Sequence, residues 1–143
     1  MKVKECMSSN VLSVSPDASA SHVAKIMMDN HVGCVPVCDT NKKIIGIVTD
    51  RDLILRIIAC DKDARQTPVS EVMTTKVYTA APDSEISEAQ KIMSQWQIKR
   101  VPVVQNEEVI GIITVGDLAN NTNEVGRVVE DICRCDENAK NNE

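Results

Sequence analysis

The sequence predicts a mixed α/β fold (an α+β mixture) in which two β-α-β-β-α units pack through their sheets. The first observation is a tandem repeat: residues 7–38 align without gaps on residues 73–104, with eleven of the 32 pairs identical. The second is the order of patterns in each copy, where a helical period precedes two apolar runs. The third is a Gly-x-x-Thr-x-x-Asp motif that closes both copies, as GIVTDRD at residues 46–52 and GIITVGD at residues 111–117.

Each copy begins with a short extended segment followed by an amphipathic helix. Residues 11–14 and 77–79 are expected to be extended. They lead to Ser15-Pro16 and Ala81-Pro82, where the residue before proline is pushed out of the helical region. In the next stretch, apolar residues recur on one face of a 3.6-residue period, and Asp17, Asp83 or the serines just after them are candidate N-caps. The apolar face comprises Val23, Ile26 and Met27 in the first copy, and Ile86, Ala89, Ile92, Met93 and Trp96 in the second.

Two apolar runs then predict a hairpin of largely buried strands in each copy. Polar turns at residues 39–43 and 105–108 separate VPV from IIGIV, and VPVV from VIGII. The Thr-x-x-Asp sequence begins a second helix, expected over residues 52–60 in the first copy and interrupted at residues 120–123 in the second. A terminal amphipathic helix should follow, with one face comprising Val125, Val128, Val129 and Ile132.

These patterns predict a domain organisation along the 143 residues. One unit of about sixty residues buries too little surface to be stable alone, so the two should share a core. The predicted parts are repeat 1 at residues 1–60, a polar linker at 61–70, repeat 2 at 71–122, a C-terminal amphipathic helix at 123–135 and a tail at 136–143.

Composition excludes several classes of function. With 43% hydrophobic and 26% charged residues, the chain should be globular. A net charge of −5, one Trp, one Tyr and no Phe disfavour nucleic acid as a partner, because such proteins show basic faces and aromatic stacking platforms. No apolar run reaches the roughly 20 residues that span a bilayer, and no apolar run follows the first lysines. We therefore expect a cytoplasmic protein with no membrane partner.

The six cysteines and the catalytic motifs give weak signals. No pair of cysteines has the C-x2-C spacing of structural zinc sites, and a reducing cytosol favours free, buried thiols. The chain contains no G-x-x-x-x-G-K-[ST], G-x-S-x-G or H-E-x-x-H sequence. We therefore expect neither a metal site nor an enzyme.

The repeated Thr and Asp have two interpretations. Thr49 and Thr114 could be helix N-caps, with Asp52 and Asp117 at the third helical position completing a capping box. A single copy would favour that structural role, because caps are common. Two copies at equivalent places in a repeat favour a role in binding.

A β-α-β-β-α repeat with Pro-Asp before its first helix, a V-P-V strand and a G-h-h-T-x-x-D exit (h, apolar) resembles the CBS domain. Two in tandem resemble a Bateman module, an adenosine-ligand sensor found alone and attached to enzymes and channels. The resemblance covers roughly residues 3–119, nearly the whole chain. It implies a standalone CBS pair with two ligand clefts at the inter-repeat interface, related by a pseudo-twofold axis.

The resemblance also implies which residues line the clefts. In the family, the exit Asp accepts hydrogen bonds from the ribose hydroxyls, the Thr approaches ribose and phosphate, and adenine lies between apolar strand residues. Each cleft pairs one repeat's exit motif with the other repeat's first strand and V-P-V approach. Cleft A would comprise Ile47, Thr49, Asp52, Val77, Tyr78, Thr79, Lys99, Arg100, Val101 and Pro102. Cleft B would comprise Leu12, Ser13, Val14, Gly33, Cys34, Val35, Pro36, Ile112, Thr114 and Asp117.

The two clefts should differ in charge. Lys99 and Arg100 precede the V-P-V strand that faces cleft A, where cleft B has Gly33 and Cys34. Because adjacent cations suit a phosphate chain, we expect cleft A to hold a phosphorylated ligand better. Cleft B should prefer a less charged adenosine ligand or stay empty.

The sequence thus predicts a regulatory, non-catalytic module that senses AMP, ADP or ATP, has no cofactor beyond that ligand, forms a homodimer and regulates an unidentified protein. The same cleft could take S-adenosylmethionine, NAD or cyclic di-AMP instead. A second class of function is a ligand-free interaction module. A third is a metal or redox sensor using Cys34, Cys38, Cys133 and Cys135.

Overall fold

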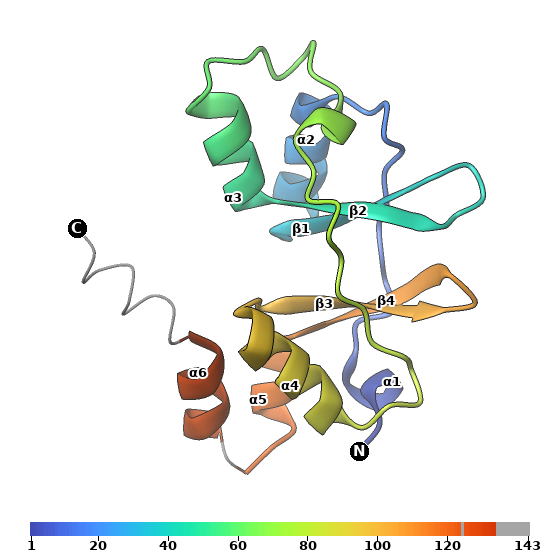
Figure 1. Ribbon diagram of the computed structural model, residues 1–143, viewed down its shortest axis with the longest axis vertical. Helices are drawn as coiled ribbons and strands as arrows, with labels where there is room; N and C mark the ends of the chain where they lie inside the picture. The colour runs from blue at the N-terminus through green and yellow to red at the C-terminus, as the bar shows by residue number, and fades with distance from the viewer. Residues whose placement is uncertain (124, 134–143) are drawn as a thin grey trace. The chain divides into compact units, whose positions relative to one another are not determined.

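The computed structural model describes residues 1–123 and 125–133. The chain divides into two compact units, which are described separately (Figure 1). Leu12–Val77 forms the first-repeat unit, and Met1–Val11 joins Tyr78–Glu143 in the second-repeat unit. The units do not follow the predicted repeat boundaries, because each contains the segment that opens the other repeat. Those boundaries and the packing of the two sheets stay predictions.

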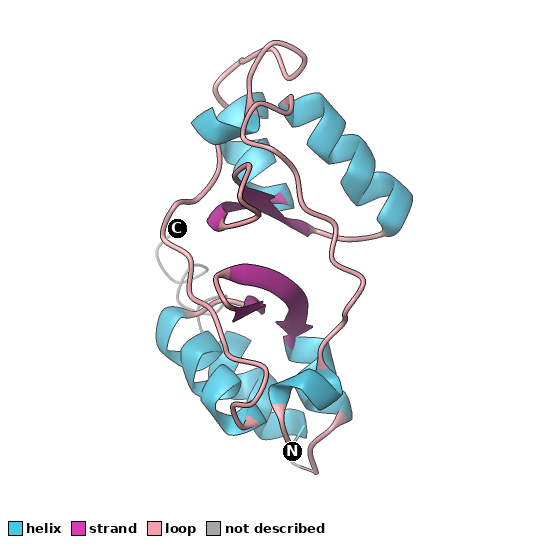
Figure 2. Ribbon diagram, turned by 90° about the vertical axis from the view of Figure 1, so that its right-hand side faces the viewer, coloured by secondary structure: helices cyan, strands magenta, loops and turns pink. Residues whose placement is uncertain are grey.

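The first-repeat unit is a hairpin covered on one face by helices (Figures 1 and 2). Val23 and Met27 of the first helix pack with Val35, Val37 and Val48 of the hairpin in one buried cluster. The elements are α2 (Ala20–Asn30), β1 (Cys34–Cys38), β2 (Ile44–Thr49), α3 (Asp50–Leu53), the π-helix η1 (Ile54–Ile58) and the 3-10 turn η2 (Val69–Glu71).

The second-repeat unit repeats this arrangement and adds a helix at each end. Ala89 and Met93 pack with Val101, Val103 and Ile113 in its buried core. The elements are α1 (Val3–Cys6), α4 (Ile86–Trp96), β3 (Arg100–Gln105), β4 (Glu108–Thr114), α5 (Val115–Asn120) and α6 (Val125–Cys133). The mixed α/β class predicted from the sequence is confirmed, since both units combine a two-stranded sheet with helices.

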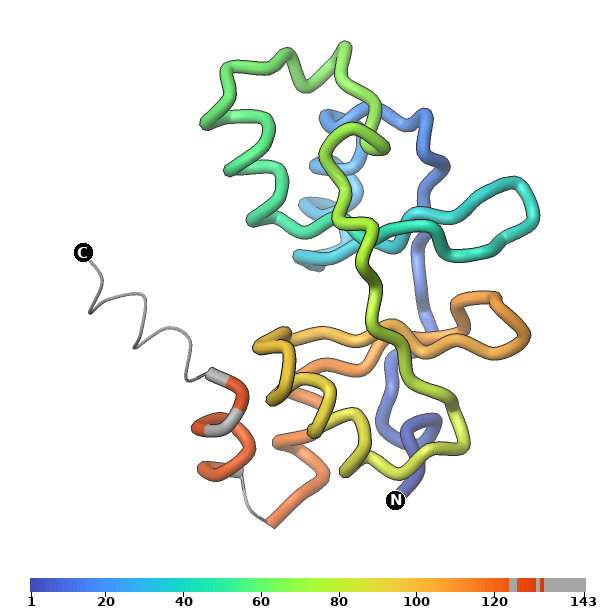
Figure 3. Tube along the Cα trace, viewed as in Figure 1, coloured from blue at the N-terminus to red at the C-terminus, as the bar shows by residue number. Residues whose placement is uncertain are grey.

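Single-residue bridges widen each hairpin on both sides. Val14, the last residue of the predicted extended segment 11–14, pairs in parallel with Val37. In the second copy the equivalent bridge joins Ala80 with Val103, one residue after the predicted segment 77–79, and neither segment forms a strand. On the opposite edges, Thr74 pairs antiparallel with Ile47. Ser8 likewise exchanges two backbone hydrogen bonds with Ile112, at 2.9 and 3.0 Å. Figure 3 shows the blue N-terminal segment beside the orange hairpin of β3 and β4. Each sheet is thus completed by the opening residue of the other repeat.

The glycine of the repeated motif is explained by this pairing. A Cβ on Gly46 would lie 2.5 Å from Met73 Sδ and 3.1 Å from the Thr74 carbonyl oxygen. A Cβ on Gly111 would lie 2.5 Å from Met7 Sδ and 2.9 Å from the Ser8 carbonyl oxygen. The missing side chain therefore lets the crossing segment approach the strand closely.

Several helix boundaries differ from the expectation. Ser19 caps α2 by accepting from the His22 amide at 3.1 Å, but Glu85 precedes α4 without a side-chain cap bond, so Asp83 and Ser84 are not its cap. The exit helix of the first copy begins at Asp50 rather than at residue 52, and it continues as a π-helix to Ile58. The capping box fixes that earlier start. The interruption after Asn120 is confirmed.

The terminal helix and the linker are both packed against a unit. Val128 and Ile132 of α6 are buried, whereas Val129 is 40% exposed, so the buried face of α6 is narrower than the predicted apolar face. Val125 lies outside the described side chains.

In the linker, the Thr67 carbonyl accepts from the Ala20 amide at 2.9 Å, and the Val69 amide donates to the Ala18 carbonyl at 2.7 Å. Within the described residues, no helix is long and apolar enough to cross a membrane.

Candidate functional site

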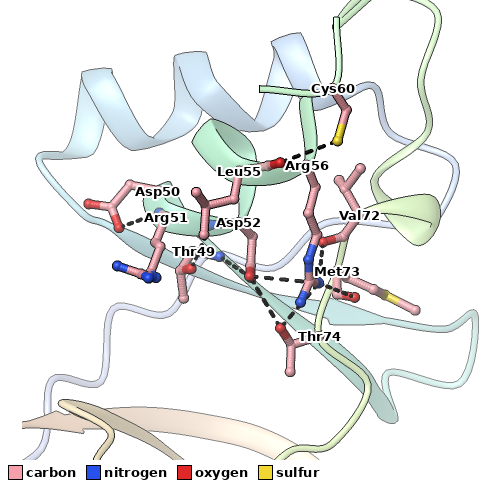
Figure 4. A network of polar contacts seen from close by, with 10 residues as sticks. All are labelled: Thr49, Asp50, Arg51, Asp52, Leu55, Arg56, Cys60, Val72, Met73 and Thr74. Carbon is pink, nitrogen blue, oxygen red and sulfur yellow. Dashed lines mark hydrogen bonds and ion pairs between the residues drawn. The ribbon is translucent and has the colours of Figure 1, made fainter. Parts of the chain in front are cut away.

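The repeated Thr-x-x-Asp forms a full capping box in the first-repeat unit. The Asp52 amide donates to Thr49 Oγ1 at 3.1 Å, and the Thr49 amide donates back to Asp52 Oδ2 at 3.0 Å. Figure 4 shows the carboxylate directed from α3 toward the segment at Thr74. The structural role weighed for these residues is therefore real, and the carboxylate is fixed in place by the backbone.

The Asp52 carboxylate has further partners that the sequence did not predict. The Thr74 hydroxyl donates to both carboxylate oxygens at 3.3 Å (Figure 4). Arg56 Nη1 lies 3.7 Å from Asp52 Oδ1, and it donates to the carbonyls of Val72 and Met73 at 2.9 and 3.1 Å. The Asp52 side chain is 12% exposed. The sequence feature that could have pointed to Thr74 is its place in the repeat, where Met73 and Thr74 align with Met7 and Ser8.

The second-repeat unit contains the same box with fewer contacts. Thr114 N donates to Asp117 Oδ2 at 2.9 Å, and Asp117 N donates to Thr114 Oγ1 at 3.2 Å. Among the described residues, no side chain donates to the Asp117 carboxylate, which is half-buried. Asn121 donates to the Asp117 backbone carbonyl instead, at 2.7 Å.

The structure divides the predicted cleft A residues between the two units. Ile47, Thr49 and Asp52 lie together at the end of β2 and the start of α3. Most of the other cleft A residues belong to the second-repeat unit. Tyr78 and Thr79 precede the Ala80 bridge, Lys99 precedes β3, and Arg100, Val101 and Pro102 lie in β3. Val77 ends the first-repeat unit. Their union in one cleft stays a prediction.

Tyr78 has an aromatic partner within its own unit. Its ring stacks on Trp96, with centroids 4.4 Å apart and planes inclined by 15°. Trp96 ends α4 and is 43% exposed. The stack therefore joins the extended segment before Ala80 to the helix of the same repeat.

The cations Lys99 and Arg100 lie beside the exit motif of their own repeat. Arg100 is the β-ladder partner of Thr114, and opposite residues of an antiparallel pair share one face of the sheet. The Val115 amide donates to the Lys99 carbonyl at 3.0 Å. In the other unit the same contacts join Cys34 with Thr49, and Gly33 with Asp50.

The cleft B residues also lie in two groups. Leu12, Ser13 and Val14 run beside β1, where the Val14 amide donates to the Pro36 carbonyl at 3.0 Å. Cys34, Val35 and Pro36 are buried in β1, directly after Gly33. Ile112, Thr114 and Asp117 lie at the end of β4 and in α5 of the other unit. The joining of these groups is likewise a prediction.

The cysteines within the described part of the chain do not form a metal centre. No three His, Cys, Asp or Glu side chains there gather closely enough to hold an ion. Burial raises the pKa of the Cys38 thiol, although a hydrogen bond with Ser13 opposes the shift. That thiol therefore stays protonated at neutral pH. Cys135 and the Cys133 side chain lie outside the described residues.

The fold and the site define a class of protein. Two similar α/β units each present a carboxylate, fixed by a capping box, where a buried strand meets a helix. The family model described as CBS domain matches residues 3–59 and 69–123. The chain therefore belongs to the CBS-domain family and carries a tandem pair, and CBS pair proteins are regulatory ligand-binding modules.

Individual relatives support this assignment. CBS domain-containing protein YhcV of Bacillus subtilis is 40% identical over 119 residues, which are 83% of this chain and 84% of that protein. The crystal structure of the CBS domain protein TA0289 from Thermoplasma acidophilum has a TM-score of 0.83 at 27% identity, over 93% of this chain and 74% of that one. The CBS domain pair of protein MJ0100, in complex with 5-methylthioadenosine and S-adenosyl-L-methionine, has a TM-score of 0.77 at 30% identity, over 85% and 94%.

Proposed function

We propose that the protein is a non-catalytic regulatory module that binds an adenosine nucleotide (AMP, ADP or ATP) through the carboxylates of its two exit motifs. The observation that carries this proposal is the fixed Asp117 carboxylate, whose Oδ1 accepts no hydrogen bond from the described residues. Two vicinal ribose hydroxyls are suitable donors for such a carboxylate. Hydrogen bonds to an ionised acceptor are roughly twice as strong as neutral ones.

The cation pair supports a phosphorylated ligand. Arg100 shares a sheet face with Thr114, so a nucleotide held by Asp117 would have a guanidinium nearby for its phosphate. The sequence assigned these cations to the cleft of Asp52 instead. A double-mutant cycle for AMP binding separates the two assignments. If Arg100 serves the nucleotide held by Asp117, the effects of Arg100→Gln and Asp117→Asn should be coupled. If it serves the cleft of Asp52, the effects of Arg100→Gln and Asp52→Asn should be coupled.

Other adenosyl ligands share the ribose chemistry. The MJ0100 pair, 30% identical to this chain, is in complex with two adenosyl compounds without phosphate, and this favours the adenosyl class over any single member. S-adenosylmethionine, NAD and cyclic di-AMP are therefore included in the test. A ligand-free interaction module is the remaining alternative, in which both Thr-Asp pairs serve only as helix caps.

The test is isothermal titration calorimetry of wild type and of Asp52→Asn and Asp117→Asn with AMP, ADP, ATP, S-adenosylmethionine, NAD and cyclic di-AMP. Asn retains an oxygen for the cap but loses the charge, so loss of two ribose hydrogen bonds to a charged group should weaken binding by about a hundredfold or more. The control is Asp29→Asn, an exposed carboxylate of α2, which should leave binding unchanged. Binding of no compound, or equal binding by all variants, would refute the proposal.

We also propose that the module is a homodimer and that an unidentified protein reads its ligand state. Large apolar side chains of the first-repeat unit are exposed at Met28, Ile54 and Ile58, at 68%, 54% and 69%. The equivalent helices of the second-repeat unit pack against α6. A second copy would cover such a surface. Light scattering should give twice the monomer mass for wild type and the monomer mass for Ile58→Glu; a monomeric wild type would contradict this.

A further inference from the structure

The two exit-motif carboxylates differ in how many donors they already serve. Asp52 accepts from the Thr49 amide and from the Thr74 hydroxyl, and Arg56 adds an ion pair at 3.7 Å. Asp117 accepts from the Thr114 amide alone among the described residues. The sequence motif around both residues is the same, so the difference comes from residues outside it.

Two substitutions between the repeats account for this difference. Thr74 aligns with Ser8, which is exposed and makes no side-chain hydrogen bond with the described residues. When the alignment of the two exit motifs is continued, Arg56 corresponds to Asn121. The Asn121 side-chain amide donates to the Asp117 backbone carbonyl rather than to its carboxylate. The second repeat therefore lacks both side-chain donors.

Arg56 and Thr74 act as one device. Arg56 Nη1 lies 3.4 Å from Thr74 Oγ1, which accepts its hydrogen bond, and the Thr74 hydroxyl proton is directed to Asp52. The same guanidinium nitrogen bonds the Val72 and Met73 carbonyls, so it fixes the segment that carries Thr74. We refer to Arg56 and Thr74 as the clasp.

The clasp competes with a ribose. A carboxylate offers roughly four lone-pair positions, and a ribose needs two of them with suitable geometry. At Asp52 both oxygens are already engaged, and the side chain is 12% exposed. A ribose therefore competes with the Thr74 hydroxyl for positions on both Asp52 oxygens, whereas at Asp117 it meets no competing side-chain donor among the described residues.

We propose that the clasp makes Asp52 the weaker ribose-binding site, and that the open carboxylate of Asp117 is the stronger one. This inference rests on the proposed function and names which repeat holds the ligand. The bonds from Thr74 are long, at 3.3 Å, and Arg56 is 47% exposed, so the clasp can open. Arg56 and Thr74 are positioning residues, since they act on the ligand through Asp52.

The test uses adenosine, which lacks the phosphate that Lys99 and Arg100 could attract. Calorimetry of wild type should resolve a tight and a weak site. Asp117→Asn should abolish the tight site. The near-isosteric Thr74→Val should strengthen the weak site by about tenfold, since it removes the competing hydrogen bond to Asp52. The neutral Arg56→Gln should strengthen the same site, since it removes the ion pair with Asp52 and the guanidinium that holds the Thr74 segment.

Matched variants keep the test independent of folding. Ser8→Ala changes the equivalent residue of the other repeat and should alter neither site nor the melting temperature. Thr74→Val without ligand should melt about 3–5 °C lower, because a hydrogen bond to a charged group is lost. A circular dichroism spectrum unchanged from wild type shows that each variant is folded.

The outcomes are distinct. Loss of the tight site in Asp52→Asn rather than in Asp117→Asn would overturn the inference while the proposed function stands. A weak site that is unchanged in Thr74→Val would do the same, whatever the melting temperature of that variant. Binding of no adenosyl compound to wild type or to Thr74→Val would overturn the proposed function and the inference with it.

Discussion

The two exit segments begin alike and then differ. Both start with a Thr-Asp capping box at the end of a buried strand. In the first-repeat unit the chain continues as a π-helix that carries Arg56 and exposes Ile54 and Ile58. In the second-repeat unit the helix stops at Asn120, and α6 follows. The difference teaches that the motif sets the local geometry, whereas the residues after it decide which carboxylate stays open and which surface is covered.

The covering role of α6 gives the largest expected effect. Val128 is 2% exposed in the core of the second-repeat unit, and its neighbour Val129 is 40% exposed on the same helix. Val128→Asp should lower the free energy of unfolding by about 3 kcal/mol or more, because it buries an unpaired charge. Urea denaturation measures this.

The adjacent residue is the control for that comparison. Val129→Asp should change the free energy of unfolding by less than about 1 kcal/mol, because the charge stays in water. Equal losses for the two variants would mean that α6 does not cover the unit through the face of Val128.

The closely approached glycine of the exit motif is shared by the two units, so its substitution should destabilise both. Gly46→Ala and Gly111→Ala should each cost about 1–3 kcal/mol, since the new Cβ meets a methionine sulfur and a backbone oxygen. Gly111 should be the more sensitive, because its closest backbone oxygen is at 2.9 Å rather than 3.1 Å. Denaturation in urea compares the two.

A third glycine shows whether the effect comes from crowding or from glycine itself. The nearest atom to a Cβ on Gly116 of α5 is at 3.6 Å, an ordinary contact. Gly116→Ala should therefore stabilise by about 0.5–1 kcal/mol through helix propensity. A loss at Gly116 as large as that at Gly111 would contradict the close-approach argument.

The smallest expected effect is electrostatic and belongs to one unit alone. Lys4 Nζ lies 2.9 Å from Asp83 Oδ1, and this hydrogen bond and charge hold the pKa of the Asp83 carboxyl below its usual range. A lowered pKa in the folded state stabilises the protein above the unfolded value of about 3.9, and that contribution is lost as the pH falls through the folded pKa. Asp83→Asn should therefore melt slightly below wild type at pH 7 and level with it near pH 2.

The equivalent residue of the other repeat is the control. Asp17 has no ion-pair partner among the described residues, so the melting temperature of Asp17→Asn should stay level with that of wild type at both pH values. Because Asp83 is exposed, 0.5 M salt should also reduce its effect. A gap that persists at low pH would exclude the ion pair as its cause.

The hairpins and the capping boxes could be predicted from the sequence, because each depends on residues close together in the chain, and the repeat could be predicted from the similarity of the two halves. The apolar run around Gly46 and the spacing of Thr49 and Asp52 are local signals of this kind. The contacts of Asp52 with Thr74 and Arg56 could not be predicted, since they depend on which edge of the sheet the later segment joins. The π-helix was missed because, over only five residues, the side-chain pattern of a helix with i→i+5 hydrogen bonds cannot be told from that of an α-helix.

The exchange of opening segments has a consequence for biosynthesis. A nascent chain that ends at residue 60 contains the β1–β2 hairpin and its helices, but it lacks the linker and Thr74, which pair with α2 and with the edge of β2. The residues around Ser8 emerge first, yet their pairing partner Ile112 is among the last parts of the fold to be made. Such distant pairing slows folding, because a long loop must close before the contact can form. The residues around Ser8 must therefore wait for their partner strand until residue 112 has been synthesised, although residues 1–4 can pair with residues 82–86 earlier.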